Sequence, residues 1–360
     1  MKKAAFFIVI VFAFLSCGRQ QAPSERIEGP FLILSTPYFA DGAVDYASLV
    51  EEARFAASWD TPGIIWPQSN DAVDLLTREE KFAGMAALVK AWAEKPCGTV
   101  LTLGVNGDDT ADMMVYAREA ERLAEESGVD IALCARPPYY GMDEAAQQEY
   151  FDSLASIAKH PVIIQTYVNE AAPVMSVDFL VALAKKYPDT YGWIKEESNH
   201  LEANARQQGE LAAKPYIKTV FSAWGGWQWL YQRRQIGTAG LISEKIAYAP
   251  ITSCVWQAMK EDREDLTEAY AMYRLMIDQR FLKTDALRGY ALHYLVRLGI
   301  FENMVSRVPA VQADGPSKTW TPGTKGLWKL HEVELTPMQT AELDRCYDDM
   351  MAFVNKHYKR

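Results

Sequence analysis

A lysine closes one short apolar run of this 360-residue chain, and a glutamate follows two positions later. The run is Tyr191–Ile194, followed by Lys195 and then Glu197. Both side chains face the same way if the run is a strand, because side chains alternate along a strand. A desolvated lysine loses its charge more readily and can then form an iminium, an electron sink that stabilises an adjacent carbanion. These residues indicate Schiff-base chemistry; a surface lysine at a strand end is the alternative.

Glu197 has two opposing effects on such a lysine. A carboxylate at this position can shuttle protons between the groups that react. The same carboxylate favours the charged form of Lys195, which opposes nucleophilic attack. The sequence leaves both roles of Glu197 open, a catalytic one and a structural salt bridge.

A lysine of this kind needs a rigid frame, and the chain has a regular alternation of segments. Short apolar runs recur at a spacing of roughly 30 residues, with amphipathic segments between them. The runs are Phe31–Ser35, Gly63–Trp66, Thr99–Leu103, Ile131–Ala135, Val162–Thr166, Tyr191–Ile194, Thr219–Ser222 and Gly240–Ile242. The clearest amphipathic segments are Tyr46–Trp59, Thr77–Glu94, Asp109–Ser127 and Glu144–Lys159. Apolar strands separated by helices indicate a parallel sheet, and eight units predict a (β/α)8 TIM barrel of the α/β class.

The C-terminal part of the chain lacks the alternation of strands and helices. Residues 30–250 are expected to form the barrel, and residues 251–360 a C-terminal helical appendage packed on it. Helical periodicity covers Leu266–Leu282, Thr284–Leu298 and Pro337–Tyr358. Val311–Leu327 is rich in Pro, Gly, Ser and Thr and is expected to be a surface loop.

The chain begins with two lysines and an uncharged apolar stretch that ends in Leu15-Ser16-Cys17-Gly18. The stretch is too short for a spanning helix, which needs about 20 residues, and is typical of a signal peptide. The tetrapeptide resembles a bacterial lipobox. We therefore expect a lipoprotein signal over residues 1–17, lipidation of Cys17, a tether over residues 18–29, and a lipid-anchored protein of the bacterial cell envelope, on the periplasmic side or the cell surface.

Several classes of partner are not expected. The net charge is −10 without a basic block, which argues against nucleic acid. The five histidines and five cysteines show no HExxH or CxxC spacing, so no metal site is expected. No GxGxxG follows the first run, which argues against a dinucleotide, and we expect no cofactor. Cys134, within an apolar run, is expected to be a buried free thiol.

Several segments, in order and at barrel spacing, resemble the dihydrodipicolinate synthase / N-acetylneuraminate lyase family of class I pyruvate aldolases, from about Pro30 to Asn355. They are Ser35-Thr36-Pro37-Tyr38, Leu76-Thr77-Arg78-Glu79-Glu80, Pro138-Tyr139-Tyr140, Pro161–Ile164, Gly192–Ser198 and Gly237–Ser243. The resemblance implies a Schiff base between Lys195 and pyruvate or another 2-oxo acid. It implies a place for Tyr140 in a proton relay, for Thr36 in the substrate site, and for the chain in a homo-oligomer, a dimer or tetramer.

Two departures lie where the family binds and protonates its substrate. Gln68-Ser69-Asn70-Asp71-Ala72 stands where the family has Gly-Thr-Thr-Gly-Glu; Ser69 keeps a hydroxyl, and Asn70 can donate to a carboxylate. Gln165 stands where the family has its acid–base tyrosine, and it can bind a substrate oxygen but cannot transfer a proton as a phenol does. Tyr167 shares a face with Gln165 and is expected to replace that phenol, or else to be a rim aromatic.

Two further departures concern the substrate. Glu170 stands where the synthase has the arginine for its second substrate, so dihydrodipicolinate synthesis is not expected. Trp224, Trp227 and Trp229 lie in the segment that lyases use for sugar acids; they can stack on a sugar ring, although at least one is expected in the core.

Three functions remain open at this point. The first is an aldolase, lyase or dehydratase acting on pyruvate or a 2-oxo (sugar) acid through Lys195. The second is a lipoprotein that binds a small acid or sugar acid without turnover, which the loss of the strand-five tyrosine favours. The third is a structural surface protein, which the retained lysine does not favour.

Overall fold

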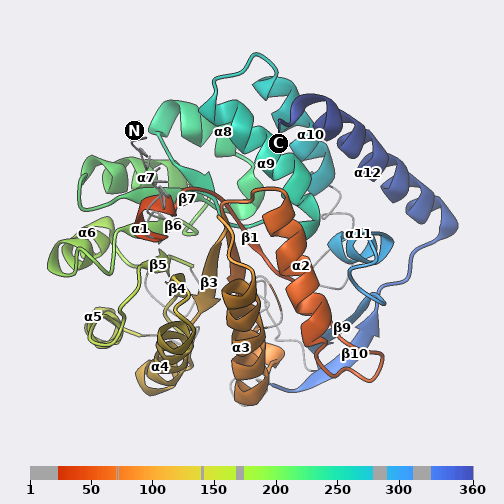
Figure 1. Cartoon of the computed structure of the whole chain (residues 1–360). Coiled ribbons are helices and arrows are strands. Elements are labelled where there is room, and N and C mark those ends of the chain that lie inside the picture. The colour runs from red at the N-terminus through yellow and green to blue at the C-terminus, as the bar shows by residue number, and fades with distance from the viewer. Residues whose placement is uncertain are drawn as a thin grey trace, which may run out of the picture.

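Eight parallel strands form a closed barrel in the computed structural model, which describes residues 23–69, 71, 73–138, 142–167, 174–278, 290–310 and 326–359 (Figure 1). The strands are β1 Gly29–Ile33, β2 Gly63–Trp66, β3 Val100–Gly104, β4 Ile131–Ala135, β5 Val162–Gln165, β6 Trp193–Lys195, β7 Thr219–Ser222 and β8 Gly240–Leu241. Each strand pairs with the next, and β8 pairs with β1. All eight predicted strands are confirmed, with their ends displaced by two residues or fewer.

The barrel interior is packed rather than hollow. Inward side chains of successive strands form one buried cluster that includes Phe31, Ile65, Cys134, Ile163 and Trp193. A second and larger cluster fills the space between the strands and the surrounding helices. This arrangement distinguishes inward from outward positions on every strand, which decides where each candidate side chain points.

Helices surround the barrel between successive strands (Figure 1). They are α2 Tyr46–Ser58, α3 Arg78–Glu94, α4 Thr110–Ser127, α5 Glu144–Ala155, α6 Val177–Lys186 and α7 Ala203–Ala212, with shorter turns η1 Val73–Leu75, η2 Trp224–Gly226, α8 Trp229–Tyr231, η3 Gln232–Ile236 and η4 Ile246–Tyr248. The capping box predicted at the start of α3 is present: Glu80 donates its backbone N–H to Thr77, and the Thr77 N–H donates to the Glu80 carboxylate.

Helix α5 ends four residues before the predicted end at Lys159. The carboxylate of Glu121, on α4, accepts hydrogen bonds from the backbone N–H groups of Lys159 and His160, at 2.8 and 3.2 Å. Pro161 then disfavours helical geometry at the residue before it. The periodicity of this segment therefore continues past the point where tertiary contacts end the helix.

The C-terminal region is helical in most of its described part, but not throughout. It contains α9 Ala249–Lys260, α10 Leu266–Asp278, α11 Ala291–Arg297 and α12 Pro337–His357. The strands β9 Val305–Pro309 and β10 Trp328–Glu332 form a separate antiparallel pair, so the prediction of an all-helical region is wrong there. Most of the predicted loop Val311–Leu327 lies outside the described residues.

Arg307 on β9 attaches this strand pair to the barrel. Its guanidinium donates to both carboxylate oxygens of Glu80, at 2.6 and 2.8 Å, and to the carbonyl oxygen of Gly42. The same group lies over the rings of Tyr38 and Trp328, 4.9 and 4.3 Å from their centroids. A buried cation thus joins β9 to the start of α3 and to the loop after β1.

The chain enters the barrel at the amino ends of the strands. The short helix α1, Pro23–Arg26, lies there, and Arg26 donates to the carbonyl oxygen of Gly98, just before β3. Ile27 is buried in the cluster that fills the barrel. This entry segment therefore closes the end of the barrel opposite to the carboxyl ends of the strands.

None of the helices in the described part of the chain is long and apolar enough to cross a membrane.

Candidate active site

Lys195 ends β6 and points into the barrel. The side chain is 0% exposed, and its Nζ lies 2.9 Å from Oε2 of Glu197. Among the described residues, this ion pair is the one polar contact of the Lys195 amine, for which no hydrogen bond is found. A buried lysine thus stands at the carboxyl end of a barrel strand, where enzymes of this architecture place their reactive groups.

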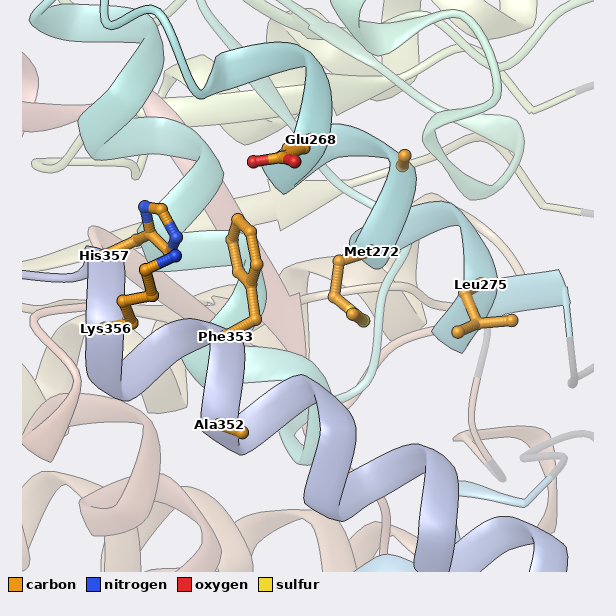
Figure 2. A pocket seen from close by; sticks show the side chains of 8 residues that line it. Glu268, Met272, Leu275, Ala352, Phe353, Lys356 and His357 are labelled. Carbon is orange, nitrogen blue, oxygen red and sulfur yellow. The ribbon is translucent and has the colours of Figure 1, made fainter.

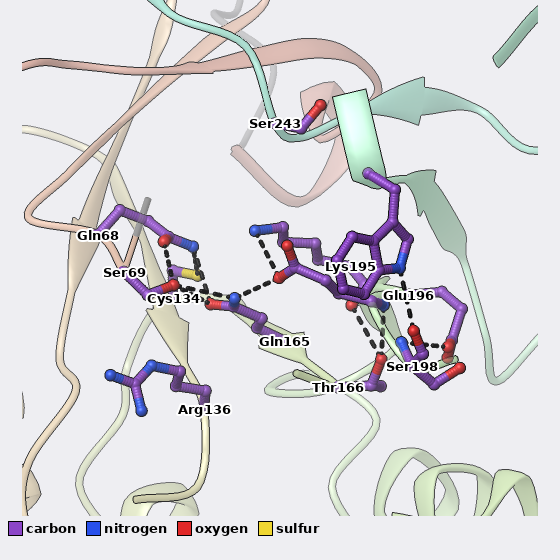
Figure 3. Close-up of polar contacts among 12 residues, drawn as sticks. Gln68, Ser69, Cys134, Arg136, Gln165, Thr166, Lys195, Glu196, Ser198 and Ser243 are labelled. Atoms are coloured by element: carbon purple, nitrogen blue, oxygen red, sulfur yellow. Dashed lines mark hydrogen bonds and ion pairs between the residues drawn. The ribbon is translucent and has the colours of Figure 1, made fainter. Parts of the chain in front are cut away.

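Glu197 connects the lysine to β5. Its Oε2 accepts a hydrogen bond from Nε2 of Gln165 at 2.5 Å, and its side chain is 14% exposed. Gln165 and Lys195 are paired residues of neighbouring strands. Figure 3 shows this chain of contacts from the lysine through the carboxylate to the amide. Glu197 is therefore placed to exchange a proton with the amine, and its orientation is fixed by Gln165.

A group of amides and hydroxyls continues from Gln165 toward β2. Gln165 donates to Oγ of Ser69 at 3.0 Å, and Gln68 donates to Oε1 of Gln165 at 2.8 Å. Ser69 donates to Oε1 of Gln68 at 2.6 Å. The structure thus brings four predicted residues, Lys195, Glu197, Gln165 and Ser69, into one connected set.

Cys134 lies in the wall of this set as a buried free thiol, as predicted. Burial raises the pKa of Cys134 to about 11, while the positive charge of Lys195 acts in the opposite direction. The thiol is therefore protonated near neutral pH and is not a nucleophile there.

Thr166 fixes the backbone that carries the ion pair. Its N–H donates to the carbonyl oxygen of Lys195 at 3.1 Å, and its Oγ1 accepts from the Glu197 N–H at 2.7 Å. The two contacts hold β5 and β6 together just past the end of β6. Sequence reasoning did not assign this role to Thr166, because a threonine that ends an apolar run carries no distinctive signal.

Tyr167 is half-buried near Glu197. Burial is the largest cause that raises the pKa of its phenol, and the negative charge of Glu197 adds to it. The phenol is therefore a protonated group near the carboxylate. Its proposed role as a proton donor stays a prediction.

Thr36 is fully buried, and its hydrogen-bond partners are not Lys195, Glu197, Gln165 or Ser69. Its N–H and its hydroxyl both donate to the carboxylate of Asp71, and its Oγ1 accepts from Nε1 of Trp66 at 3.0 Å. These contacts fix Asp71 at the end of the loop after β2. A direct contact of Thr36 with substrate stays a prediction.

Three predicted residues lie outside the described part of the chain: Asn70, Tyr140 and Cys17.

The model of the dihydrodipicolinate synthetase family matches residues 26–314. This chain belongs to that family.

The sequence is similar to named members of the family at low identity. It is 24% identical over 206 residues to the 4-hydroxy-tetrahydrodipicolinate synthase of Rhizobium meliloti (strain 1021). The aligned segment covers 55% of this chain and 67% of that enzyme. It is 28% identical over 180 residues to the enzyme of the same name from Methanothermobacter thermautotrophicus, covering 49% of this chain and 59% of that enzyme. The matched segments thus span about three fifths to two thirds of the length of these two relatives.

Solved structures agree in fold over nearly their whole length. The 4-hydroxy-tetrahydrodipicolinate synthase of Methylacidiphilum fumariolicum SolV has a TM-score of 0.70 at 15% identity, covering 92% of this chain and 100% of that one. The N-acetylneuraminate lyase of Proteus mirabilis has a TM-score of 0.63 at 15% identity, covering 90% and 99%. At such identities the likeness establishes the barrel.

This family member carries a buried carboxylate pair behind the lysine strand. Glu196, next to Lys195, accepts from Nε of Arg206 at 3.1 Å and from the backbone N–H of Ser198 at 2.9 Å. Burial, followed by the charge of Glu196, raises the pKa of Glu210 well above its ordinary range. The charge on Glu210 is therefore disfavoured, which reduces the repulsion between the two carboxyl groups that share Arg206.

The three tryptophans of the segment after β7 have different surroundings. Trp229 is fully buried against Tyr273, which confirms that at least one belongs to the core. Trp224 adopts a left-handed backbone conformation, with φ of 56°, and donates from Nε1 to the carbonyl oxygen of Ser198 at 3.0 Å. Trp227 is 49% exposed. Stacking of a sugar ring on Trp224 or Trp227 stays a prediction.

A hollow lies away from the barrel mouth, between α10 and α12 (Figure 2). Its volume is about 600 Å³, and Met272, Leu275 and Phe353 form most of its apolar wall. None of the predicted site residues lines it.

Within the described ranges, no group of three or more His, Cys, Asp or Glu side chains is arranged to hold a metal ion.

Proposed function

We propose that this protein is a Schiff-base aldolase, lyase or dehydratase that acts on pyruvate or another 2-oxo acid, including sugar-derived ones. The observation that carries the proposal is the fully buried Lys195 at the carboxyl end of β6, with its amine 2.9 Å from Glu197. A lysine removed from water needs a chemical reason, because its charge is costly to bury. Membership of the family supports the same chemistry.

The groups present can carry out the steps of imine formation. Glu197 takes the extra proton of the Lys195 ammonium, and the neutral amine attacks C2 of the 2-oxo acid. The carbinolamine then loses its hydroxyl as water when Glu197 returns that proton. A base takes the proton of the C4 hydroxyl, the C3–C4 bond breaks, the C4 fragment leaves as an aldehyde, and the iminium accepts the electron pair to become an enamine. Protonation at C3 turns the enamine back into an iminium, and water hydrolyses it to free the 2-oxo acid and the Lys195 amine. Ser69 and Gln68 lie close enough to Gln165 to bind the carboxylate or the oxygen at C2 in the same place.

The test is borohydride reduction of the full chain in the presence of pyruvate and a panel of 2-oxo sugar acids, followed by intact and peptide mass spectrometry. A reduced adduct on Lys195 is expected, and Lys195→Ala is expected to lose it.

Lys218→Ala is the matched control. Burial lowers the pKa of Lys218, which lies over the ring of Trp193, so this lysine is also prone to modification. It precedes β7, at the amino end of the barrel. An adduct that survives Lys195→Ala and is lost in Lys218→Ala would contradict the proposal.

We propose further that the reaction differs from 4-hydroxy-tetrahydrodipicolinate synthesis. Gln165 occupies the strand-five position expected for an acid–base tyrosine, and it is held between Ser69 and Glu197. Proton transfer therefore passes to Glu197, with Tyr167 as the neighbouring phenol. Measured synthase activity with pyruvate and its aldehyde partner would refute this part.

The closed hydrogen-bond group of Gln68, Ser69 and Gln165 favours a second candidate, a barrel that binds a small acid without turnover. Tight reversible binding without a trapped adduct would establish this alternative.

The cellular setting is proposed from the sequence. We infer that Cys17 is lipidated and that the barrel is held at the bacterial cell envelope, on the periplasmic side or the cell surface. We also propose a homo-oligomer, a dimer or tetramer, with a small acid as its ligand and no nucleic acid.

A further inference from the structure

A second buried cation borders the mouth of the barrel. Arg136 directly follows β4, and its side chain is 3% exposed. Cys134, two residues earlier, belongs to the cluster that fills the barrel. Since alternate residues share a face, Arg136 comes from the inward side of β4, one step nearer the mouth. A guanidinium in this position is costly to desolvate unless it meets negative charge.

Strand pairing brings Arg136 beside the candidate site. Ala135 pairs with Ile164, and Gln165 pairs with Lys195. The residues that follow these pairs on β4, β5 and β6 therefore meet at one end of the sheet. Figure 3 shows Arg136 on the same side of Lys195 as Ser69 and Gln165.

The charges of Arg136 and of the Lys195–Glu197 pair act on the same neighbouring side chains, which supports the placement of Arg136 beside the candidate site. Burial raises the pKa of the Cys134 thiol, and the positive charges of Lys195 and Arg136 both act to lower it. Burial and the charge of Glu197 raise the pKa of Tyr167, whereas Arg136 acts to lower it. One thiol and one phenol thus lie near both Arg136 and the Lys195–Glu197 pair.

The Arg136 guanidinium has protein partners, and two of its contacts are with Asp74 and Pro137. Its Nη2 lies 3.7 Å from Oδ2 of Asp74, and its Nη1 donates to the carbonyl oxygen of Pro137 at 3.2 Å. A separation of 3.7 Å is longer than a direct hydrogen bond. A guanidinium has five N–H donors in a planar fork, so it can hold Asp74 and an anionic ligand group together.

We propose that Arg136 binds a second anionic group, a carboxylate or a phosphate, on the 2-oxo acid that Lys195 holds. This inference rests on the proposed Schiff-base function and narrows its substrate class to 2-oxo acids with a further negative charge. Neighbouring strands lie about 4.8 Å apart, and only β5 separates β4 from β6. The second anionic group of such a ligand therefore has to extend from β6 past β5 toward β4. The fork of an arginine suits both groups in a bidentate manner.

The experiment compares ligands of matched length on the full chain. Half-saturating concentrations for the borohydride-trapped adduct are measured by intact mass for 2-oxopentanoate, which has one carboxylate, and 2-oxoglutarate, which has two. A third arm uses 2-oxo-4-phosphonobutanoate, which separates phosphate-like from carboxylate recognition. We expect the wild type to prefer one of the dianionic ligands over 2-oxopentanoate.

Substitution of the arginine is expected to remove this preference. In Arg136→Gln the ratio of the half-saturating concentrations should fall by about tenfold or more, the usual effect of losing a charged hydrogen bond. Arg136→Lys should recover part of the preference, because the charge is kept but the fork is lost. Asp74→Asn is the matched control, because it removes the carboxylate beside Arg136 and keeps the cation; the preference should persist or increase.

The outcomes separate this inference from the function on which it rests. The absence of an adduct with every ligand would overturn the Schiff-base function itself. Adducts that form equally well with one and two anionic groups in the wild type would overturn only the role of Arg136. The same conclusion follows if Arg136→Gln keeps its preference. Circular dichroism reports folding of each variant, and the wild-type comparison together with Arg136→Lys decides the matter if Arg136→Gln does not fold.

Discussion

Glu197 is the residue whose role depends most on geometry. Sequence spacing places it on the face of Lys195 but leaves its two effects in balance. The structure gives the carboxylate a second partner, Gln165, at the oxygen that faces the amine. A carboxylate held in this way is ordered for proton transfer, and its attraction for the ammonium is shared with an amide. We therefore expect catalysis to outweigh the cost of stabilising the charged lysine.

Glu197→Gln tests this at the level of single steps. In D₂O, an enamine formed from pyruvate exchanges the protons at C3 for deuterium, which proton NMR follows without knowledge of the natural substrate. The substitution should slow this exchange by about 10²-fold or more, in the range expected for a lost general acid–base group. The borohydride adduct on Lys195 should still accumulate at long reaction times, but more slowly than in the wild type, because imine formation also uses Glu197.

The rate of deuterium exchange and the rate of adduct formation are compared in the same variant. An unchanged exchange rate would make Glu197 a structural partner of the lysine. Loss of both exchange and adduct would show that the ion pair is needed to position Lys195.

The sequence predicted the residues at strand ends better than the contacts between them. Lys195 and Glu197 were found because a charge that closes an apolar run is unusual, and Arg136 after β4 carries the same signal. The Gln68–Ser69–Gln165 group depends on segments almost 100 positions apart, whose relative orientation no local pattern specifies. Thr36 was placed in the substrate site by resemblance, whereas its observed partners are Asp71 and Trp66.

At the scale of elements, the ion pair of Arg307 with Glu80 is one of the contacts that attach the strand pair β9–β10 to the barrel. Burial alone raises the pKa of Glu80, but hydrogen bonds from Arg307 and from the backbone of Thr77 outweigh it and lower the pKa below its ordinary value. The folded state thus binds a proton at Glu80 more weakly than the unfolded chain. The stabilisation from this group is complete above the unfolded pKa of about 4.3 and is lost as the pH falls through the lower folded value.

Urea unfolding at pH 3 and pH 6 measures this contribution. Glu80→Gln should make the free energy of unfolding less dependent on pH between these values than in the wild type. Arg307→Leu should lower that free energy at pH 6 by roughly 1–2 kcal/mol, because it leaves a partly buried carboxylate without its cation. Equal pH dependence in Glu80→Gln and the wild type would show that other carboxylates govern acid unfolding.

Regular elements were predictable where their pattern is set locally. The eight strands and the capping box of α3 follow from periodicity and from Thr77 and Glu80. The end of α5 was not predictable, because Glu121 on another helix determines it. The strands β9 and β10 were not predictable, because their residues lack the continuous apolar run of a barrel strand. They flank a long Pro- and Gly-rich segment and are held by Arg307.

At the scale of the whole molecule, the proposed lipid on Cys17 is open to a direct test. Metabolic labelling of bacterial cells that express the full chain with an alkyne-bearing fatty acid should mark the wild type and not Cys17→Ser. The wild type should fractionate with membranes. If Cys17→Ser also stays on the membranes after mild washing, the protein has a second kind of attachment. Labelling of Cys17→Ser would contradict the proposal.

The closed amino end of the barrel then sets an orientation. Six residue steps separate Cys17 from Pro23 at the start of α1, at most about 20 Å of extended chain. At that end of the barrel, Arg26 of α1 donates to Gly98, and Ile27 is buried. A lipid on Cys17 would hold this end toward the bilayer, with Lys195 and Arg136 facing the aqueous compartment. Such a protein would collect dissolved, charged solutes that diffuse past the surface, and lipids within the bilayer would be out of its reach.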